Sequence, residues 1–358
     1  MIDFDYAILK CPITQESLKF VDKSSANEYI GNYDVDFIET IDEISAGFVN
    51  ESSTYFYPIF QEIILLLPVY GLFIGKGENI KNKMAFDKER VFKYYNEINY
   101  QTKNGLKIYE DSPKWVDFRE VSGEYIRNSF TRAKQYLNPR GKYFLDIASG
   151  PIGLQEYLEL SNNYDIRICV DISINALIQA KYNYVHKQGI FICGDITNIP
   201  LKDDTCDAVL CQHTLYHIPK GEQRTAVNEL YRVAKPHTNI AIVYSWFYHS
   251  WFMNISLAPI QVYRIARHFV GKLYVRLFNS KPRLYFYPHS QGWFKRQFEF
   301  SSKVEFYCWR STNIYFLNLY IHKWLWGKQF LTFLRKTEEK HPRFWGRFGD
   351  YPIIVIKK

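Results

Sequence analysis

The stretch FLDIASGPIGLQEYL (residues 144–158) passes from an apolar run through one acid and a group of small residues into a segment with helical character. The apolar run ends at Asp146, and the turn that follows is built from Ala148, Ser149, Gly150 and Gly153. Small residues let the backbone turn closely into a helix, which leaves amide groups and space for a ligand at the helix N-terminus. The stretch therefore predicts a strand, a tight turn and a helix at a nucleotide-like site.

Residues 138–246 alternate apolar runs with amphipathic ones, as expected when parallel strands are joined by helices. The predicted strands are residues 143–148, 166–172, 189–195, 206–213 and 239–245, with a last strand at 351–358. Helices are predicted at 176–188 and 221–234. The fold class predicted is α/β, a Rossmann-like doubly wound sheet, and its ligand should lie beyond the carboxyl ends of the strands.

Polar residues follow three further strands of this predicted sheet. Asp171 comes 25 residues after Asp146, at the end of the second strand, where a carboxylate can accept hydrogen bonds from both ribose hydroxyls. Asp195 follows the third strand, where an acid can receive an exocyclic adenine amine. The residues that we expect to bind the cofactor are Asp146, Ala148, Ser149, Gly150, Gly153, Asp171, Ile172, Asp195, Ile196 and Gln212.

In their order and spacing, these features resemble the class I S-adenosylmethionine-dependent methyltransferases over about residues 115–246. The matching stretches are FLDIASGPIG, VDIS, GDITNIPLKDDTCDAVLCQHTLYHIP and ELYRVAKPHTNIAIVYS. The chain is similar to the branch that includes quinone-biosynthesis and natural-product enzymes. The resemblance implies S-adenosylmethionine as cofactor.

The same resemblance implies a role for individual residues of the turn and the strand ends. Asp146 would help to hold the donor's ammonium group, Asp171 the ribose and Asp195 the adenine amine, and Gly150 would allow close approach to the methionine portion. The family's turn reads Asp-x-Gly-x-Gly-x-Gly, whereas Ala148 and Ile152 stand here at the first and third glycine places. An NAD-type site is the chief alternative for the turn, but ASGPIG carries a proline within it, unlike the Gly-x-Gly-x-x-Gly that suits a pyrophosphate.

Residues 1–75 contain two stretches, ILKCPITQESLKF (8–20) and YFYPIFQEIILLLP (55–68). They resemble the small zinc-binding activator proteins that partner tRNA, rRNA and release-factor methyltransferases. Thr14 stands where that family has the second cysteine of its Cys-Pro-x-Cys knuckle, and no other cysteine precedes Cys169, so we expect no metal site. We expect a small α+β domain without metal that packs against the catalytic domain and stabilises it.

Candidate catalytic residues for an acceptor that needs a general base are His213, Tyr216 and His289. His213 follows the fourth strand, Tyr216 lies on the turn beyond it, and His289 lies in the predicted substrate-facing loop at residues 285–298. His217, on the apolar side of LYHIP, is expected to be a packed histidine satisfied by a backbone carbonyl.

The rest of the chain is divided by composition. Residues 76–137 are expected to be a linker with N-terminal helices, 247–310 a helical, aromatic-rich lid over the acceptor, and 311–358 a C-terminal helix followed by the last strand. Residues 1–75 carry 3 basic against 12 acidic residues, and 247–358 carry 19 against 5. The basic C-terminal region suggests an anionic substrate or an acidic membrane surface.

Six scattered cysteines favour a reducing compartment, and we expect the cytoplasm. The N-terminus shows no secretory signal, and no apolar stretch reaches the length of a membrane span. The favoured function is methyl transfer to the oxygen or nitrogen of a small-molecule or glycan-like acceptor in a biosynthetic pathway. Two alternatives remain open. The first is an RNA methyltransferase, although nucleic acid is a less favoured partner than a small molecule. The second is a non-catalytic regulator that binds the donor.

Overall fold

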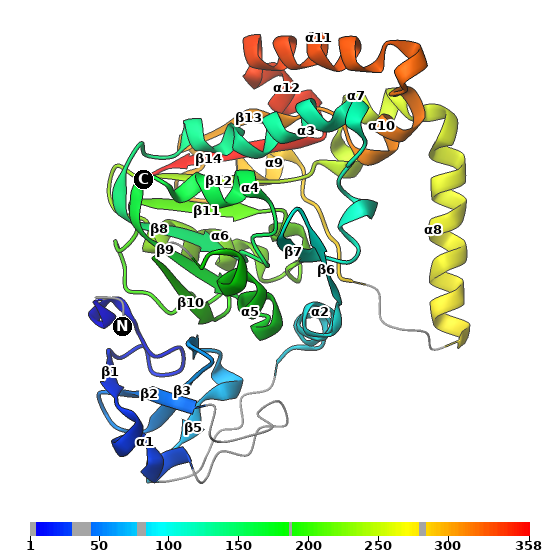
Figure 1. The fold of residues 1–358 in the computed structure, drawn as a ribbon. Helices are drawn as coiled ribbons and strands as arrows, with labels where there is room; N and C mark the ends of the chain where they lie inside the picture. The colour runs from blue at the N-terminus through cyan, green and yellow to red at the C-terminus, as the bar shows by residue number, and fades with distance from the viewer. Residues whose placement is uncertain (1–4, 31–43, 77–83, 186–187, 279–283) are drawn as a thin grey trace.

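The computed structural model describes residues 5–30, 44–76, 84–185, 188–278 and 284–358. Its core contains seven strands: β8 (Gly141–Ile147), β9 (Tyr164–Asp171), β10 (Gly189–Cys193), β11 (Ala208–Gln212), β12 (Asn239–Val243), β13 (Val304–Arg310) and β14 (Tyr351–Lys357). They lie in the order β10-β9-β8-β11-β12-β14-β13 (Figure 1). The first five strands are parallel, and β14 is antiparallel to both its neighbours. The predicted doubly wound sheet is confirmed.

The core strands are apolar on both faces because helices cover both. Leu145 and Ile147 of β8 pack in one hydrophobic cluster with α6 (Gln223–Val233), while Phe144 packs in a second cluster with α3 (Glu120–Thr131) and α11 (Gly327–Lys340). Near β10, α5 (Ile174–Asn183) packs on Cys169 and Cys193. Alternate residues of one strand therefore enter different clusters, as a sheet with two covered faces requires.

The N-terminal unit continues the same sheet. It contains β1 (Leu18–Val21), α1 (Lys23–Ile30), β2 (Ile44–Asn50), β3 (Tyr55–Phe60), β4 (Ile63–Leu65) and β5 (Leu72–Phe73). β4 pairs in parallel with β10, with Phe191 opposite Ile63 and Cys193 opposite Leu65. The acidic unit, blue in Figure 1, thus completes the edge that β10 would otherwise expose.

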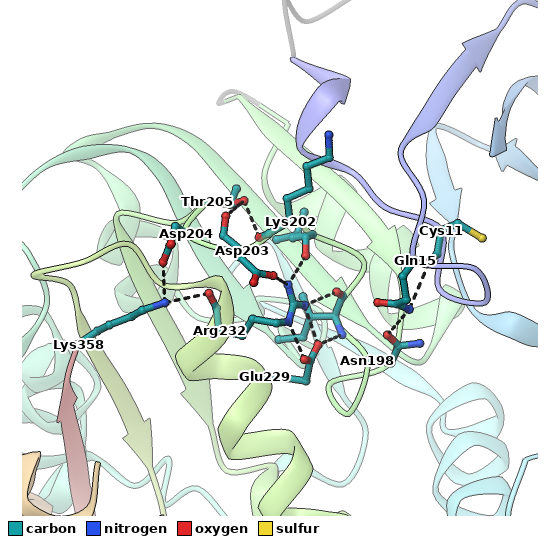
Figure 2. A network of polar contacts seen from close by, with 12 residues as sticks. Cys11, Gln15, Asn198, Lys202, Asp203, Asp204, Thr205, Glu229, Arg232 and Lys358 are labelled. Carbon is teal, nitrogen blue, oxygen red and sulfur yellow. Dashed lines mark hydrogen bonds and ion pairs between the residues drawn. The ribbon is translucent and has the colours of Figure 1, made fainter. Parts of the chain in front are cut away.

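The stretch that resembles a zinc knuckle packs on the core loop after β10. Asn198 Nδ2 donates to the carbonyl of Pro12 at 2.7 Å, and Gln15 Nε2 donates to Asn198 Oδ1 at 3.2 Å (Figure 2). Cys11 is buried, with its Sγ 3.4 Å from the hydroxyl of Tyr57. Among the residues that the structure describes, no three His, Cys, Asp or Glu side chains group as metal ligands.

Two segments differ from the expected helices. After α2 (Phe86–Glu97), residues 100–109 form a separate hairpin of β6 (Tyr100–Lys103) and β7 (Leu106–Tyr109) before α3. Residues 304–310, expected within the lid, form strand β13. The remaining α-helices are α4 (Gln155–Leu158), which follows the turn after β8, α7 (Trp251–Ser256), α8 (Ala258–Phe278), α9 (Gln291–Phe294), α10 (Ile314–Tyr320) and α12 (Pro342–Phe348). No helix in the described ranges has the length and apolar character to cross a bilayer.

Candidate functional site

A cavity of about 270 Å³ opens at the carboxyl ends of the parallel strands. Its floor lies where the order of the core strands reverses, between β8 and β11, which is where open α/β sheets bind ligands. All ten residues expected to bind the cofactor line this cavity: Asp146, Ala148, Ser149, Gly150, Gly153, Asp171, Ile172, Asp195, Ile196 and Gln212. The structure brings them together, and their individual contacts with a cofactor stay predictions.

The turn after β8 holds an unusual backbone conformation. Ala148, Gly150 and Ile152 have φ angles of 54°, 56° and 50°, in the left-handed region that favours glycine. The amide of Ala148 donates to the carbonyl of Val170 at 2.6 Å, which ties the turn to β9. Ala148 and Ile152 therefore stand at positions whose backbone conformation favours glycine. Each adopts this conformation at a steric cost, because each carries a side chain.

The β6–β7 hairpin packs against this turn. A Cβ at Gly153 would lie 2.4 Å from the carbonyl oxygen of Lys107, and one at Gly150 would lie 3.2 Å from the hydroxyl of Tyr109. Gly153 cannot be enlarged without moving the hairpin backbone, whereas at Gly150 the side chain of Tyr109 would have to shift slightly. The second glycine of the turn thus gives room to Tyr109, a cavity residue that the sequence analysis did not identify.

Asp171 joins the turn to the second strand. Its Oδ2 accepts from the amide of Gly150 and its Oδ1 from the amide of Ser173, both at 2.9 Å. Burial raises the pKa of Asp171 from 3.8 to about 6, because the backbone amides only partly offset its desolvation. A buried carboxylate that lines the cavity and retains free lone pairs can still accept ligand hydroxyls.

Asp146 makes a contact that the sequence analysis did not foresee. Its carboxylate forms an ion pair with the guanidinium of Arg167 on β9, and both side chains are almost fully buried. Arg167 also donates to the carbonyl of Tyr157 at 2.8 Å. The charge of Asp146 is therefore balanced within the protein, which leaves less of it for a cationic group in the cavity.

Asp195 is also paired. Lys88 of α2 lies 2.6 Å from Asp195 Oδ2 and 2.5 Å from Glu222 Oε2, and the second oxygen of Asp195 accepts from the amide of Thr197 at 2.8 Å. Although burial of Lys88 opposes its charge, the two carboxylates raise the pKa of Lys88. Lys88 lines the cavity and joins α2 to the strand end that carries Asp195.

Two cavity-lining side chains contain buried polar atoms that have no protein partner. These atoms are Gln212 Oε1, an acceptor, and Arg167 Nε, a donor. Buried polar atoms are nearly always satisfied, so each points to a ligand or water that completes it. Gln212 lies on β11 and Arg167 on β9, the two strands that flank β8.

The three candidate catalytic residues separate in the structure. His213 lines the cavity in a left-handed conformation (φ 55°), with its ring 4.7 Å from that of Trp309. Burial, together with the charge of Arg310, lowers the pKa of His213 to about 3, so its imidazole is neutral at ordinary pH. A general base with so low a pKa is weak.

Tyr216 and His289 are not among the residues that line the cavity, so the structure does not bring them together with His213 there, and their catalytic roles stay predictions. Tyr216 is buried among aromatic rings, 5.1 Å from that of Phe286, and burial raises its pKa well above the usual range. His289 stacks on Trp293 at 4.1 Å. The expectation for His217 is confirmed, because its Nδ1 lies 2.8 Å from the carbonyl oxygen of Tyr285.

The wall over the cavity comes from a different part of the chain than expected. Within the described residues it is supplied by positions 88–118, through Lys88, Val91, Tyr95, Ile108, Tyr109, Ser112, Val116 and Phe118, and not by the predicted lid at 247–310. The loop at 285–287 instead packs on Tyr216 and His217. The sequence feature that could have indicated this wall is the tyrosine-rich run KYYNEINY (93–100).

Comparison with known proteins gives the same assignment for the core. Residues 145–242 match the family model of the methyltransferase domain. The chain is 28% identical over 186 residues to a sterol 24-C-methyltransferase of Schizosaccharomyces pombe, covering 47% of each protein. It is 25% identical over 133 residues to a demethylmenaquinone methyltransferase of Chlamydia caviae, covering 37% of this chain and 56% of that one. The chain thus spans about half the length of these curated relatives.

Among solved structures, the chain is similar to a SAM-dependent methyltransferase from Archaeoglobus fulgidus, at 17% identity with a TM-score of 0.40 over 66% of this chain and 94% of that one. The assignment does not depend on that likeness. It follows from the family match and from the strand order around the cavity. Residues 145–242 therefore match a methyltransferase domain, and the strand order around the cavity agrees with that match.

Proposed function

We propose that the whole chain is an S-adenosylmethionine-dependent methyltransferase that methylates a small molecule with an apolar body. The observation that carries this proposal is the cavity at the strand-order reversal, where the left-handed turn, Asp171 and Asp195 converge. A methyl donor needs sites for its adenine, its ribose and its charged amino-acid end, and the cavity wall holds a suitable group for each.

The unpartnered buried atoms support the fit of the donor's amino-acid end. Gln212 Oε1 is suited to accept from an ammonium group, and Arg167 Nε to donate to a carboxylate. Asp171 would hold the ribose through the lone pairs that Gly150 and Ser173 do not use. Asp195 would face the adenine amine from beside Lys88. The expected role of Asp146 becomes indirect, since Arg167 pairs with its carboxylate.

The donor, when bound, supplies a sulfonium methyl group and a neutral thioether leaving group. The protein therefore has to align the acceptor with that methyl group, exclude water and give space for the displacement, and positioning of this kind contributes about 7 to 11 kcal/mol. His213 is neutral and lines the cavity, so it can accept a hydrogen bond from an acceptor hydroxyl. We propose that His213 orients the acceptor: as the bond between the methyl carbon and the acceptor oxygen forms and the bond to sulfur breaks, the hydroxyl proton passes to solvent water, because His213 is too weak a base to keep it.

The class of acceptor follows from the wall over the cavity. Val91, Ile108, Val116 and Phe118 present apolar side chains there. Such a wall suits a hydrophobic small molecule and offers little to a nucleic acid backbone. The two curated relatives are named for the methylation of a sterol and of demethylmenaquinone, which supports an acceptor of the same physical character.

The donor site is tested by calorimetry with S-adenosylmethionine on Asp171→Asn. We expect at least a tenfold loss of donor affinity, because a carboxylate that accepts from ribose hydroxyls is replaced by a neutral amide. Asp165→Asn, an exposed acid on the same strand, is the matched control and should bind like wild type. Equal affinity in Asp171→Asn and wild type would refute the assignment.

A further inference from the structure

Helix α8 presents an apolar face to solvent. Six large apolar side chains on it are each 56% to 67% exposed: Tyr263, Phe269, Val270, Leu273, Tyr274 and Leu277. At 3.6 residues per turn, these positions fall within an arc of about 140° on one side of the helix. Figure 1 shows α8, in yellow, projecting beside the body from the region of α7 and α10. An exposed apolar patch of this kind, which includes Tyr263, Val270, Leu273 and Leu277, marks an interaction site.

The charge of α8 restricts the identity of that occupant. The helix sequence contains Arg264, Arg267, Lys272 and Arg276 and no Asp or Glu. Arg267 is exposed and falls next to the edge of the apolar arc. An apolar face bordered by cationic residues is typical of helices that lie in the interface of an anionic bilayer. At about 31 Å in length, the helix would lie along the surface.

A second exposed apolar group lies close to the start of α8. The hydroxyl of Tyr320 in α10 donates to the carbonyl of Ser256, the last residue of α7. Helix α8 begins two residues later, at Ala258. Just after Tyr320, Trp324 and Trp326 are each 76% exposed. Lys328 follows them, and Lys323 precedes them and forms an exposed ion pair with Glu120. Tryptophan and lysine together are enriched where proteins meet the headgroup layer of a membrane.

Other occupants agree less well with these observations. A second copy of the chain would bring together two C-terminal regions that each carry 19 basic against 5 acidic residues. A nucleic acid would match the charge, but aliphatic side chains such as Val270, Leu273 and Leu277 do not stack on bases. We propose that the apolar face of α8, with Trp324 and Trp326, docks this protein on anionic membrane surfaces.

The proposal is tested by sedimentation of the full chain with vesicles, without methyl donor, so that it can fail while the proposed methyl transfer holds. Vesicles of phosphatidylcholine mixed with phosphatidylglycerol should bind the wild-type protein at low ionic strength, and pure phosphatidylcholine should bind it weakly. The double variant Leu273→Ser/Leu277→Ser should bind anionic vesicles more than about tenfold less tightly, because it removes two exposed apolar side chains from the docking face. Arg267→Glu should reduce the preference for anionic lipid.

The matched control removes two equally exposed apolar side chains outside the C-terminal region, Tyr182→Ser/Val185→Ser, and should bind like wild type. Donor affinity serves as the folding check for every variant. Failure of the wild type to bind anionic vesicles would overturn the proposal, as would an equal loss in the two double variants. A dimer that only the α8 variant dissociates, or binding to RNA without binding to vesicles, would assign the face to another partner.

Discussion

The ion pair between Arg167 and Asp146 gives a sharp test of how the donor site is built. In Arg167→Met, the carboxylate of Asp146 stays buried without its cation, and the carbonyl of Tyr157 loses a donor. The methionine side chain still fills the space near the rings of Phe144 and Tyr184, whose centroids lie 5.3 and 5.4 Å from the guanidinium carbon. Removing one partner of a buried pair costs about 3 to 5 kcal/mol, and we expect a loss of unfolding free energy in this range.

The double variant Arg167→Met/Asp146→Asn distinguishes a charge effect from a packing effect. It removes both charges, so we expect it to be at least about 2 kcal/mol more stable than Arg167→Met alone. Urea unfolding followed by tryptophan fluorescence and circular dichroism measures both, and an unchanged m-value shows that the comparison is valid. Lys181→Met, which breaks the exposed pair with Glu62, is the control and should change stability little. A loss below about 1 kcal/mol in Arg167→Met, or a double variant no more stable than that single variant, would refute the reasoning.

Three further predictions concern the same cavity. Donor affinity should fall about tenfold per pH unit below pH 6, because Asp171 must then lose a proton to bind the donor, and calorimetry should show no such slope in Asp171→Asn. Lys88→Met should free α2 from Asp195, so hydrogen exchange should quicken at residues 86–97, and unchanged exchange would contradict the contact. Ala148→Gly should raise the unfolding free energy by about 0.5 to 1 kcal/mol, because it relieves a left-handed φ; a loss of stability in urea would show that the turn is unstrained.

Six of the seven core strands could be predicted from sequence, because most of them are nearly continuous apolar runs closed by a polar residue, whereas β13 has the mixed sequence VEFYCWR and was placed in the lid. Each predicted core strand overlaps the observed one, and the strand ends place Asp171 and Asp195 at one edge. Arg167 also left a signal: a single cation inside the apolar run IRICVDI needs a buried partner, and Asp146 ends the neighbouring strand. That pairing was not inferred, because it depends on which strands are adjacent.

The β6–β7 hairpin also had a local signal. Asn104 and Gly105 have φ angles of 50° and 82° and connect Lys103 to Leu106 as a two-residue turn, the role for which an Asn-Gly pair is suited. What the sequence could not predict was where the hairpin docks. Its contact with Gly153 is made across more than 40 residues, and a lid at 247–310 was equally compatible with the local pattern.

The N-terminal unit acts on the donor site through the loop after β10. That loop carries Asp195 and Ile196 and is held from both sides: Leu9 forms a β-bridge with Leu201, and Arg232 of α6 donates to the carbonyl of Ile199 at 2.9 Å. Because β4 pairs with β10, the strand and the loop that leaves it are fixed by the same unit. A separate activator protein can dissociate, whereas a covalently attached unit keeps this edge of the sheet covered. The N-terminal unit therefore supports β10 and the loop after it, which carries Asp195 and Ile196 at the edge of the cavity.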